Sequence, residues 1–228
     1  HAGIDPNYTD TPGRIGKEKV LFFNRTLPFP IKNRFILDLD DYWVLPPTNP
    51  HYAHWARLRM SDRIAENITK AECVLTTNAR LASLISRQRG SSKDVYIVPN
   101  ALPFDTGQFV KTQLGKTLVY AGGISHIEDI KEIEHLKVDY YGGLKGSTSL
   151  PLGIYMAAYN NRLASLVPLQ KGLFNSCKSN LKILEAGAKG IGCIASPVEP
   201  YLNDVDKHVM LYGFRKGIRL DEVEQQSK

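Results

Sequence analysis

The stretch that decides the fold is residues 177–196, which read Cys177-Lys-Ser-Asn-Leu-Lys-Ile-Leu-Glu-Ala-Gly-Ala-Lys-Gly-Ile-Gly-Cys-Ile-Ala-Ser196. Its first part predicts an amphipathic helix, because Leu181 and Leu184 recur at helical spacing on one face. We expect Ser179 to cap the start of this helix and Gly190 to end it in a left-handed conformation. The apolar run that follows predicts a buried strand. The stretch is therefore typical of an α/β protein.

The charged residues of this helix allow two interpretations. Lys178, Lys182, Glu185 and Lys189 are three or four residues apart and share one face. In the first interpretation they form a solvated face with salt bridges. In the second, the amines and the free N–H groups at the helix start bind a diphosphate, and the carboxylate binds ribose hydroxyls.

Composition narrows the kind of ligand. A hydrophobic fraction of 43 % over 228 residues supports a packed core, and the net charge of +6 suits an anionic ligand or an anionic surface. The densest basic group, Arg57, Arg59, Arg63 and Lys70, lies outside any nucleic-acid-binding motif, so no nucleic-acid partner is expected. Because Tyr52 and Trp55 are nearby, a peripheral membrane contact stays open. No apolar run reaches transmembrane length.

Strand and helix patterns alternate along the chain, which predicts parallel sheets with helices on their faces. We expect strands over residues 19–24, 34–40, 73–77, 95–98, 117–121, 138–141, 163–169, 191–196 and 208–212. We expect helices over residues 61–71, 79–89, 127–136 and 152–160. Residues 1–17 predict a loop, and the tail after residue 215 a helix. The polar stretch 102–116 predicts a linker, and we set the domains at 1–110 and 111–228.

The second candidate site is Asp38-Leu39-Asp40-Asp41, at the carboxyl end of a predicted strand. Three interpretations compete for it. The carboxylates hold a divalent cation against a diphosphate, or Asp38 is the nucleophile and Asp40 the acid of a phosphatase, or the group is structural and lies on the acceptor side. Tyr42 departs from the phosphatase pattern, which expects Thr or Val there. His51 follows in the next loop as a further acceptor-side candidate.

Two pairs of glycines end predicted strands, at residues 122–123 and 142–143. Glycine lets backbone N–H groups approach a phosphate closely, and it also makes ordinary turns. Gly122 and Gly123 precede a predicted helix and are therefore the better candidates. His126 lies beside them, and an isolated histidine is more often structural than catalytic. The three cysteines lack metal-ligand spacing, and we expect free thiols in a reducing compartment.

Four segments together resemble the family 4 retaining glycosyltransferases of the GT-B fold, in a short bacterial and phage branch. They are Phe35-Ile-Leu-Asp-Leu-Asp-Asp-Tyr-Trp43, residues 71–77 with 95–100, Val119-Tyr-Ala-Gly-Gly123, and residues 165–196. The resemblance implies two facing Rossmann-like domains, with the donor held mainly by the second. The family's opening glycine-rich loop is missing and the chain begins with His1, so we expect an incomplete N-terminal domain.

The resemblance also implies roles for individual residues. The family pairs two glutamates eight positions apart, and Glu185 matches the second, which binds the donor ribose. Cys177 stands where the first is expected, and Ser125 to Glu128 stand where the family has a basic pair. The donor-binding candidates are Gly122, Gly123, Lys178, Ser179, Asn180, Lys182 and Glu185. The acceptor-side candidates are Asp38, Asp40, Asp41 and His51. No residue is assigned as catalytic.

The sequence therefore predicts a cytoplasmic, metal-independent glycosyltransferase that moves a sugar from a nucleotide diphosphate donor with retention. Its acceptor is a saccharide, a lipid or another small molecule. The donor is a substrate, and no cofactor or metal is expected. Two alternatives remain: a nucleotide-sugar- or partner-binding module without activity, and a metal-dependent transferase or phosphatase that uses Asp38 and Asp40.

Overall fold

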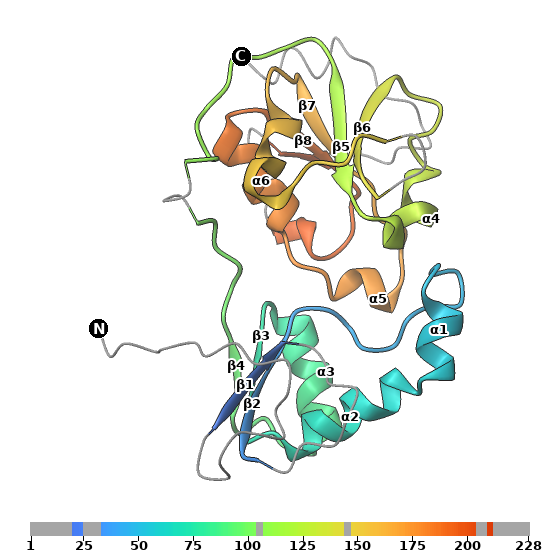
Figure 1. Ribbon diagram of the computed structural model, residues 1–228, viewed down its shortest axis with the longest axis vertical. Coiled ribbons are helices and arrows are strands. Elements are labelled where there is room, and N and C mark those ends of the chain that lie inside the picture. The colour runs from blue at the N-terminus through green and yellow to red at the C-terminus, as the bar shows by residue number, and fades with distance from the viewer. Residues whose placement is uncertain (1–19, 25–32, 104–106, 144–146, 204–208, 212–228) are drawn as a thin grey trace.

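The computed structural model describes residues 20–24, 33–103, 107–143, 147–203 and 209–211. These residues form two α/β units, each with its own parallel sheet (Figure 1). The predicted fold class, two Rossmann-like units, is confirmed. The predicted boundary at residue 110 falls between the last strand of one sheet and the first of the other, and it stays a prediction. The loop and the helix predicted for the two ends of the chain lie outside the described residues.

The N-terminal unit has a four-stranded sheet in the order β1-β2-β3-β4. In chain order its elements are β1 (Leu21–Asn24), β2 (Phe35–Leu39), α1 (Tyr52–Arg57), α2 (Met60–Lys70), β3 (Cys73–Thr76), α3 (Ala79–Arg89) and β4 (Val95–Ile97). Helix α3 matches its predicted bounds because both of its ends are encoded locally. The Asn78 side chain accepts from the Leu81 N–H at 2.9 Å, and Gly90 ends the helix at a φ of 70°.

The core of this unit lies between β2 and β3 on one side and α2 and α3 on the other. Alternate residues of β2, such as Leu37, pack inward against Ile64 and Ile68 of α2 and Leu81 of α3. This burial supplies most of the driving force for docking helices on a sheet. The short helix α1 buries none of its residues and projects from the unit (Figure 1).

The C-terminal unit has a five-stranded parallel sheet in the order β6-β5-β7-β8-β9. Its elements are β5 (Leu118–Gly122), η3 (Ile124–His126), α4 (Ile127–Ile130), β6 (Val138–Gly142), η4 (Leu152–Tyr159), β7 (Ala164–Val167), α5 (Leu173–Ser176), α6 (Leu181–Lys189), β8 (Gly192–Ala195), η5 (Tyr201–Asn203) and β9 (Val209–Leu211). Successive residues of β5 enter different cores, Leu118 and Tyr120 on one face and Val119 and Ala121 on the other. Both faces of this sheet are therefore covered, as parallel sheets require.

Three predicted helices differ from the structure. The helix expected over residues 127–136 ends at Ile130 and continues as turns, and the one over residues 152–160 is the 3-10 helix η4. The helix of the opening stretch begins at Leu181. Its N-cap is Asn180, one residue after the predicted cap, Ser179. Among the described residues, those of the predicted linker form neither helix nor strand. One of them contacts the second unit: the Thr112 N–H donates to the Lys189 carbonyl at 3.0 Å.

Hydrogen bonds join the two units at the segment that precedes α6. The Asn78 amide donates to the carbonyl oxygens of Cys177 and Lys178, at 2.9 and 3.3 Å. The Asn100 amide donates to the Ser179 hydroxyl at 2.7 Å. Loop residues on the carboxyl side of both sheets are therefore held against each other.

Candidate functional site

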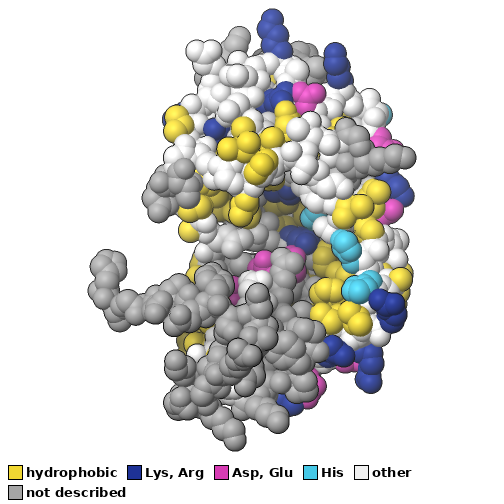
Figure 2. All heavy atoms as spheres, in the orientation of Figure 1, with side chains coloured by type: hydrophobic (Ala, Val, Ile, Leu, Met, Phe, Trp, Pro, Cys, Tyr) yellow, Lys and Arg dark blue, Asp and Glu magenta, His cyan; other side chains and the backbone are white. Residues whose placement is uncertain are grey.

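The carboxyl ends of β5 and β7 mark the place where the strand order of the second sheet reverses. From β5 the chain goes to β6 on one side and then to β7 on the other. In open α/β sheets, ligands bind in the crevice that such a reversal leaves between the following loops. Figure 2 shows a hollow between the two units, with basic, acidic and histidine side chains gathered along it.

Lys182 brings an amine to this crevice. It lies in the first turn of α6 and donates from Nζ to the Ala121 carbonyl at the end of β5. The same nitrogen lies 5.4 Å from the centre of the Tyr120 ring, a cation–π contact. Burial lowers the pKa of Lys182, and the nearby Glu185 opposes this effect. A partly desolvated ammonium group next to Gly122 is well suited to an anion.

Lys178 brings a second amine, but from the loop before α6 and not from the helix itself. Its Nζ forms an ion pair with Asp41 of the N-terminal unit at 2.9 Å and lies 4.4 Å from the centre of the Phe174 ring. The pair is largely shielded from water, since the two side chains are 14 % and 26 % exposed. Lys178 is thus drawn toward the acceptor-side candidate Asp41.

The start of α6 is not capped as predicted. Asn180 occupies the N-cap position without a side-chain cap hydrogen bond, and the Ser179 hydroxyl is engaged by Asn100 instead. The first N–H groups of a helix have no acceptor within the helix and carry its partial positive charge. The Ile183 N–H already donates to the Asn180 carbonyl at 2.9 Å, so at most the N–H groups of Leu181 and Lys182 remain for an anion.

The interpretation of the charged helix face as a solvated, salt-bridged surface is wrong. Glu185 is 8 % exposed and Lys189 5 %. The Glu185 carboxylate accepts a hydrogen bond from the Tyr159 hydroxyl at 2.6 Å, and Lys189 donates to the Gln108 carbonyl at 3.1 Å. Burial raises the pKa of Glu185, while the bond from Tyr159 opposes the rise. Tyr159 carries no sequence signal that links it to Glu185.

The two candidate glycines have different surroundings. A Cβ on Gly122 would lie 2.4 Å from the Tyr120 hydroxyl and 3.0 Å from Lys182 Nζ, so this glycine is required by local packing. Gly123 has only the Ser125 hydroxyl within 4 Å of such an atom, at 3.9 Å. Only Gly123 therefore has room beside it for a ligand.

A histidine and a carboxylate clamp the loops after β5 and β7 together. His126 Nδ1 lies 2.8 Å from one oxygen of the buried Asp129. The other oxygen accepts from the Gln170 N–H and from the Asn175 amide, both at 2.8 Å. Sequence reasoning missed Asp129, Gln170 and Asn175. The three-residue spacing from His126 to Asp129 was the only local signal, because the other partners are more than forty residues away in the sequence.

Cys177 is fully buried, but not in the crevice between the loops after β5 and β7. Although it belongs to the second half of the chain, it packs in the hydrophobic cluster of the N-terminal unit with Trp43 and Leu81. Burial raises the pKa of its thiol to about 11, so the thiol is neutral and has little nucleophilic character at neutral pH. Cys73 and Cys193, like Cys177, form no disulfide bond among the described residues.

The aspartates at the carboxyl end of β2 are not bound together as one group. Asp38 accepts from the Asn24 amide at 3.0 Å, whereas Asp41 is paired with Lys178. His51 is exposed at the start of α1, where its N–H donates to the Asn49 side chain. Among the described residues, no group of three or more His, Cys, Asp or Glu side chains is placed to hold a metal ion. The roles predicted for Asp38, Asp40, Asp41 and His51 stay predictions.

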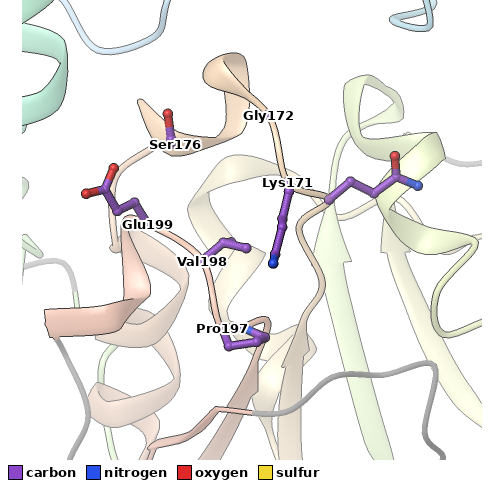
Figure 3. A pocket seen from close by; sticks show the side chains of 7 residues that line it. Lys171, Gly172, Ser176, Pro197, Val198 and Glu199 are labelled. Carbon is purple, nitrogen blue, oxygen red and sulfur yellow. The ribbon is translucent and has the colours of Figure 1, made fainter.

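A small cavity of about 230 Å³ lies at the carboxyl ends of β7 and β8 (Figure 3). Its walls are formed by Gln170, Lys171, Gly172, Ser176, Pro197, Val198 and Glu199. Figure 3 shows the Lys171 side chain extending toward Pro197. Ligand pockets commonly measure roughly 300–1,000 Å³. The cavity is therefore smaller than a typical ligand pocket.

Comparison with solved structures shows the GT-B fold of glycosyltransferases. An apo structure of OtsA matches with a TM-score of 0.54 and 12 % identity over 93 % of this chain and 68 % of that chain. A UDP-forming α,α-trehalose-phosphate synthase from Burkholderia xenovorans matches with 0.53 and 12 %, over 93 % and 69 %. A trehalose-6-phosphate synthase, also OtsA, matches with 0.52 and 12 %, over 93 % and 68 %.

Sequence comparison adds no family. No family model matches the chain, and no curated protein matches it. Among the described residues, no helix is long and apolar enough to cross a membrane. The GT-B architecture is thus established by structure, and membership of family 4 stays a prediction.

Proposed function

We propose that the protein is a glycosyltransferase that takes a sugar from a nucleoside diphosphate donor and transfers it with retention, without a metal ion. One observation carries the proposal. Lys182 Nζ lies beside Gly122 at the reversal point of the sheet, the start of α6 has no side-chain cap, and Lys178 is near enough for its charge to act on Lys182. A diphosphate is the common anion that two amines and the N–H groups at a helix start would bind together.

In this proposal the protein assists the reaction by electrostatics. As the glycosidic bond to the diphosphate breaks, negative charge grows on the leaving oxygen, and Lys182 with the N–H groups of α6 would stabilise it. Glu185 would bind the donor ribose through Oε1, which none of the described residues bonds. The donor would lie mainly on the second unit. A saccharide, lipid or other small acceptor would approach from the side of Asp41 and His51.

Donor binding is the first test. We expect UDP-, GDP- or ADP-glucose to raise the melting temperature, and isothermal titration calorimetry to give an affinity that EDTA leaves unchanged. Lys182→Ala should weaken binding by roughly tenfold to a hundredfold, the usual contribution of a hydrogen bond to a charged group. Lys70→Ala is the matched control, since that lysine is 57 % exposed on the other unit. Equal affinity in Lys182→Ala and the parent protein would contradict the proposal.

Retention of the anomeric configuration is tested on the product of the reaction. If the donor is consumed with an acceptor, nuclear magnetic resonance of the product should show the anomeric configuration of the donor. An inverted product would refute this part of the proposal. Activity that disappears in EDTA would favour the metal-dependent alternative built on Asp38 and Asp40 instead.

One observation favours binding without turnover as the second candidate. The resemblance places a carboxylate at position 177, but Cys177 packs in the other unit's core, and its side chain cannot reach donor hydroxyls from there. A protein of this kind would be stabilised by a nucleotide sugar and would release no nucleoside diphosphate over long incubation with any acceptor. A cytoplasmic location and a peripheral membrane contact near Trp55 belong to the proposal in either form.

A further inference from the structure

The position that the resembled family gives to a basic pair is occupied here by the loop that carries His126. Three facts define this histidine. Its side chain is 14 % exposed, its Nδ1 is held 2.8 Å from Asp129, and none of the described residues bonds Nε2. A carboxylate on Nδ1 fixes the proton on that nitrogen and leaves Nε2 as the free acceptor.

Burial and the nearby lysines disfavour the charged form of His126. Burial lowers the pKa of its imidazole, and the two lysines of the crevice, Lys178 and Lys182, lower it further. Asp129 opposes both effects through its hydrogen bond and its charge. Among the described residues, Lys178, Lys182 and Asp129 are the charged groups whose effect on the ring is resolved. The other two side chains that bond Asp129 or lie in the clamp, Gln170 and Asn175, are neutral.

We propose that His126 is a donor-binding residue that takes up one proton when the diphosphate enters, so that donor binding and protonation are coupled. The inference rests on the proposed function and deepens it. The diphosphate of a nucleotide sugar brings two negative charges into a crevice that holds two ammonium groups. This reverses the local field, and an imidazolium ion can then donate from Nδ1 to Asp129 and from Nε2 to a phosphate oxygen.

The clamp gives this protonation a structural purpose. Asp129 is already bonded to the Gln170 N–H and the Asn175 amide, so it ties the loop after β5 to the loop after β7. A charged His126 would strengthen its bond to Asp129 at the moment when both loops contact the donor. The structure thus offers a third positive group at the diphosphate that is absent until the ligand arrives.

The experiment is calorimetry of UDP-glucose binding in buffers with different heats of ionisation. The diphosphate diester of this donor does not titrate between about pH 5 and 8, the range in which histidine does. We expect net proton uptake in the parent protein and an affinity that rises up to roughly tenfold as the pH falls, which corresponds to one unit of pKa change.

Two variants make the test specific. His126→Asn keeps a side-chain amide that can donate to Asp129 but cannot titrate, so its binding should show neither proton uptake nor pH dependence. His135→Asn, at an exposed histidine of the same unit, should behave like the parent protein. Binding without proton uptake, or uptake that persists in His126→Asn, overturns this inference and leaves the proposed function intact. If UDP-, GDP- and ADP-glucose all fail to bind at any pH, the proposed function fails and this inference with it.

Discussion

Two equally buried tyrosines should respond to the same substitution in opposite directions. Tyr120 and Tyr159 are 1 % and 0 % exposed, and both lie in the second unit. The Tyr120 hydroxyl has no hydrogen-bond partner among the described residues, whereas the Tyr159 hydroxyl donates to Glu185 at 2.6 Å. Tyr→Phe removes one oxygen in each case and keeps the ring, including the contact of Tyr120 with Lys182.

The structure gives the size of each effect. A buried hydroxyl without a partner costs about 1–3 kcal/mol, so Tyr120→Phe should raise the free energy of unfolding by about 1 kcal/mol. A hydrogen bond to a carboxylate contributes about 1.5–3 kcal/mol, so Tyr159→Phe should lower the free energy of unfolding by about 2 kcal/mol. With a urea m-value of about 2 kcal/mol/M, the midpoints should shift by roughly +0.5 M and −1 M.

Urea unfolding followed by far-ultraviolet circular dichroism is the suitable assay. Tryptophan fluorescence would report mainly on the other unit, because Trp43 and Trp55 both belong to the N-terminal unit. Donor affinity should change little in Tyr120→Phe, since the side chain of Lys182 keeps its aromatic neighbour. If Tyr120→Phe loses as much stability as Tyr159→Phe, the Tyr120 hydroxyl has a partner and the reasoning fails.

Two further predictions concern charged groups. Asp41→Asn should free Lys178 from its ion pair and strengthen UDP-glucose binding about threefold, as measured by calorimetry. This size is expected for an ion pair that contributes under about 1 kcal/mol. An unchanged affinity would show that Lys178 does not contact the donor. Burial raises the pKa of Glu185 above 4.5, so the native state holds a proton that the unfolded state releases, and stability is lost as the pH rises from 4.5 through the raised pKa. Glu185→Gln should remove this loss, and a stability difference from the parent protein that is independent of pH would contradict the assignment.

Local sequence signals predicted those parts of the fold that depend on neighbouring residues. Helix α3 has the predicted bounds because Asn78 caps it and Gly90 ends it. Gly190 ends α6 at a φ of 72°, as expected for a glycine after an amphipathic helix. The predicted start of α6 was wrong, because the Ser179 hydroxyl accepts a hydrogen bond from Asn100 of the other unit. A partner 79 residues away gives no signal in the local sequence pattern.

The sequence by itself determined the alternation of strands and helices, and with it the two parallel sheets. Apolar runs of strand length and amphipathic helices have only a few ways to bury both faces of a sheet. It also determined which residue types could bind a diphosphate. Only the tertiary structure decided that Glu185 and Lys189 are buried, that Cys177 packs in the other unit, and that His126 is clamped by Asp129 to the loop after β7. The physical reason is the strand order. Which loops meet at the carboxyl edge depends on which strands are neighbours, and residues far apart in the chain become partners only when β7 lies beside β5.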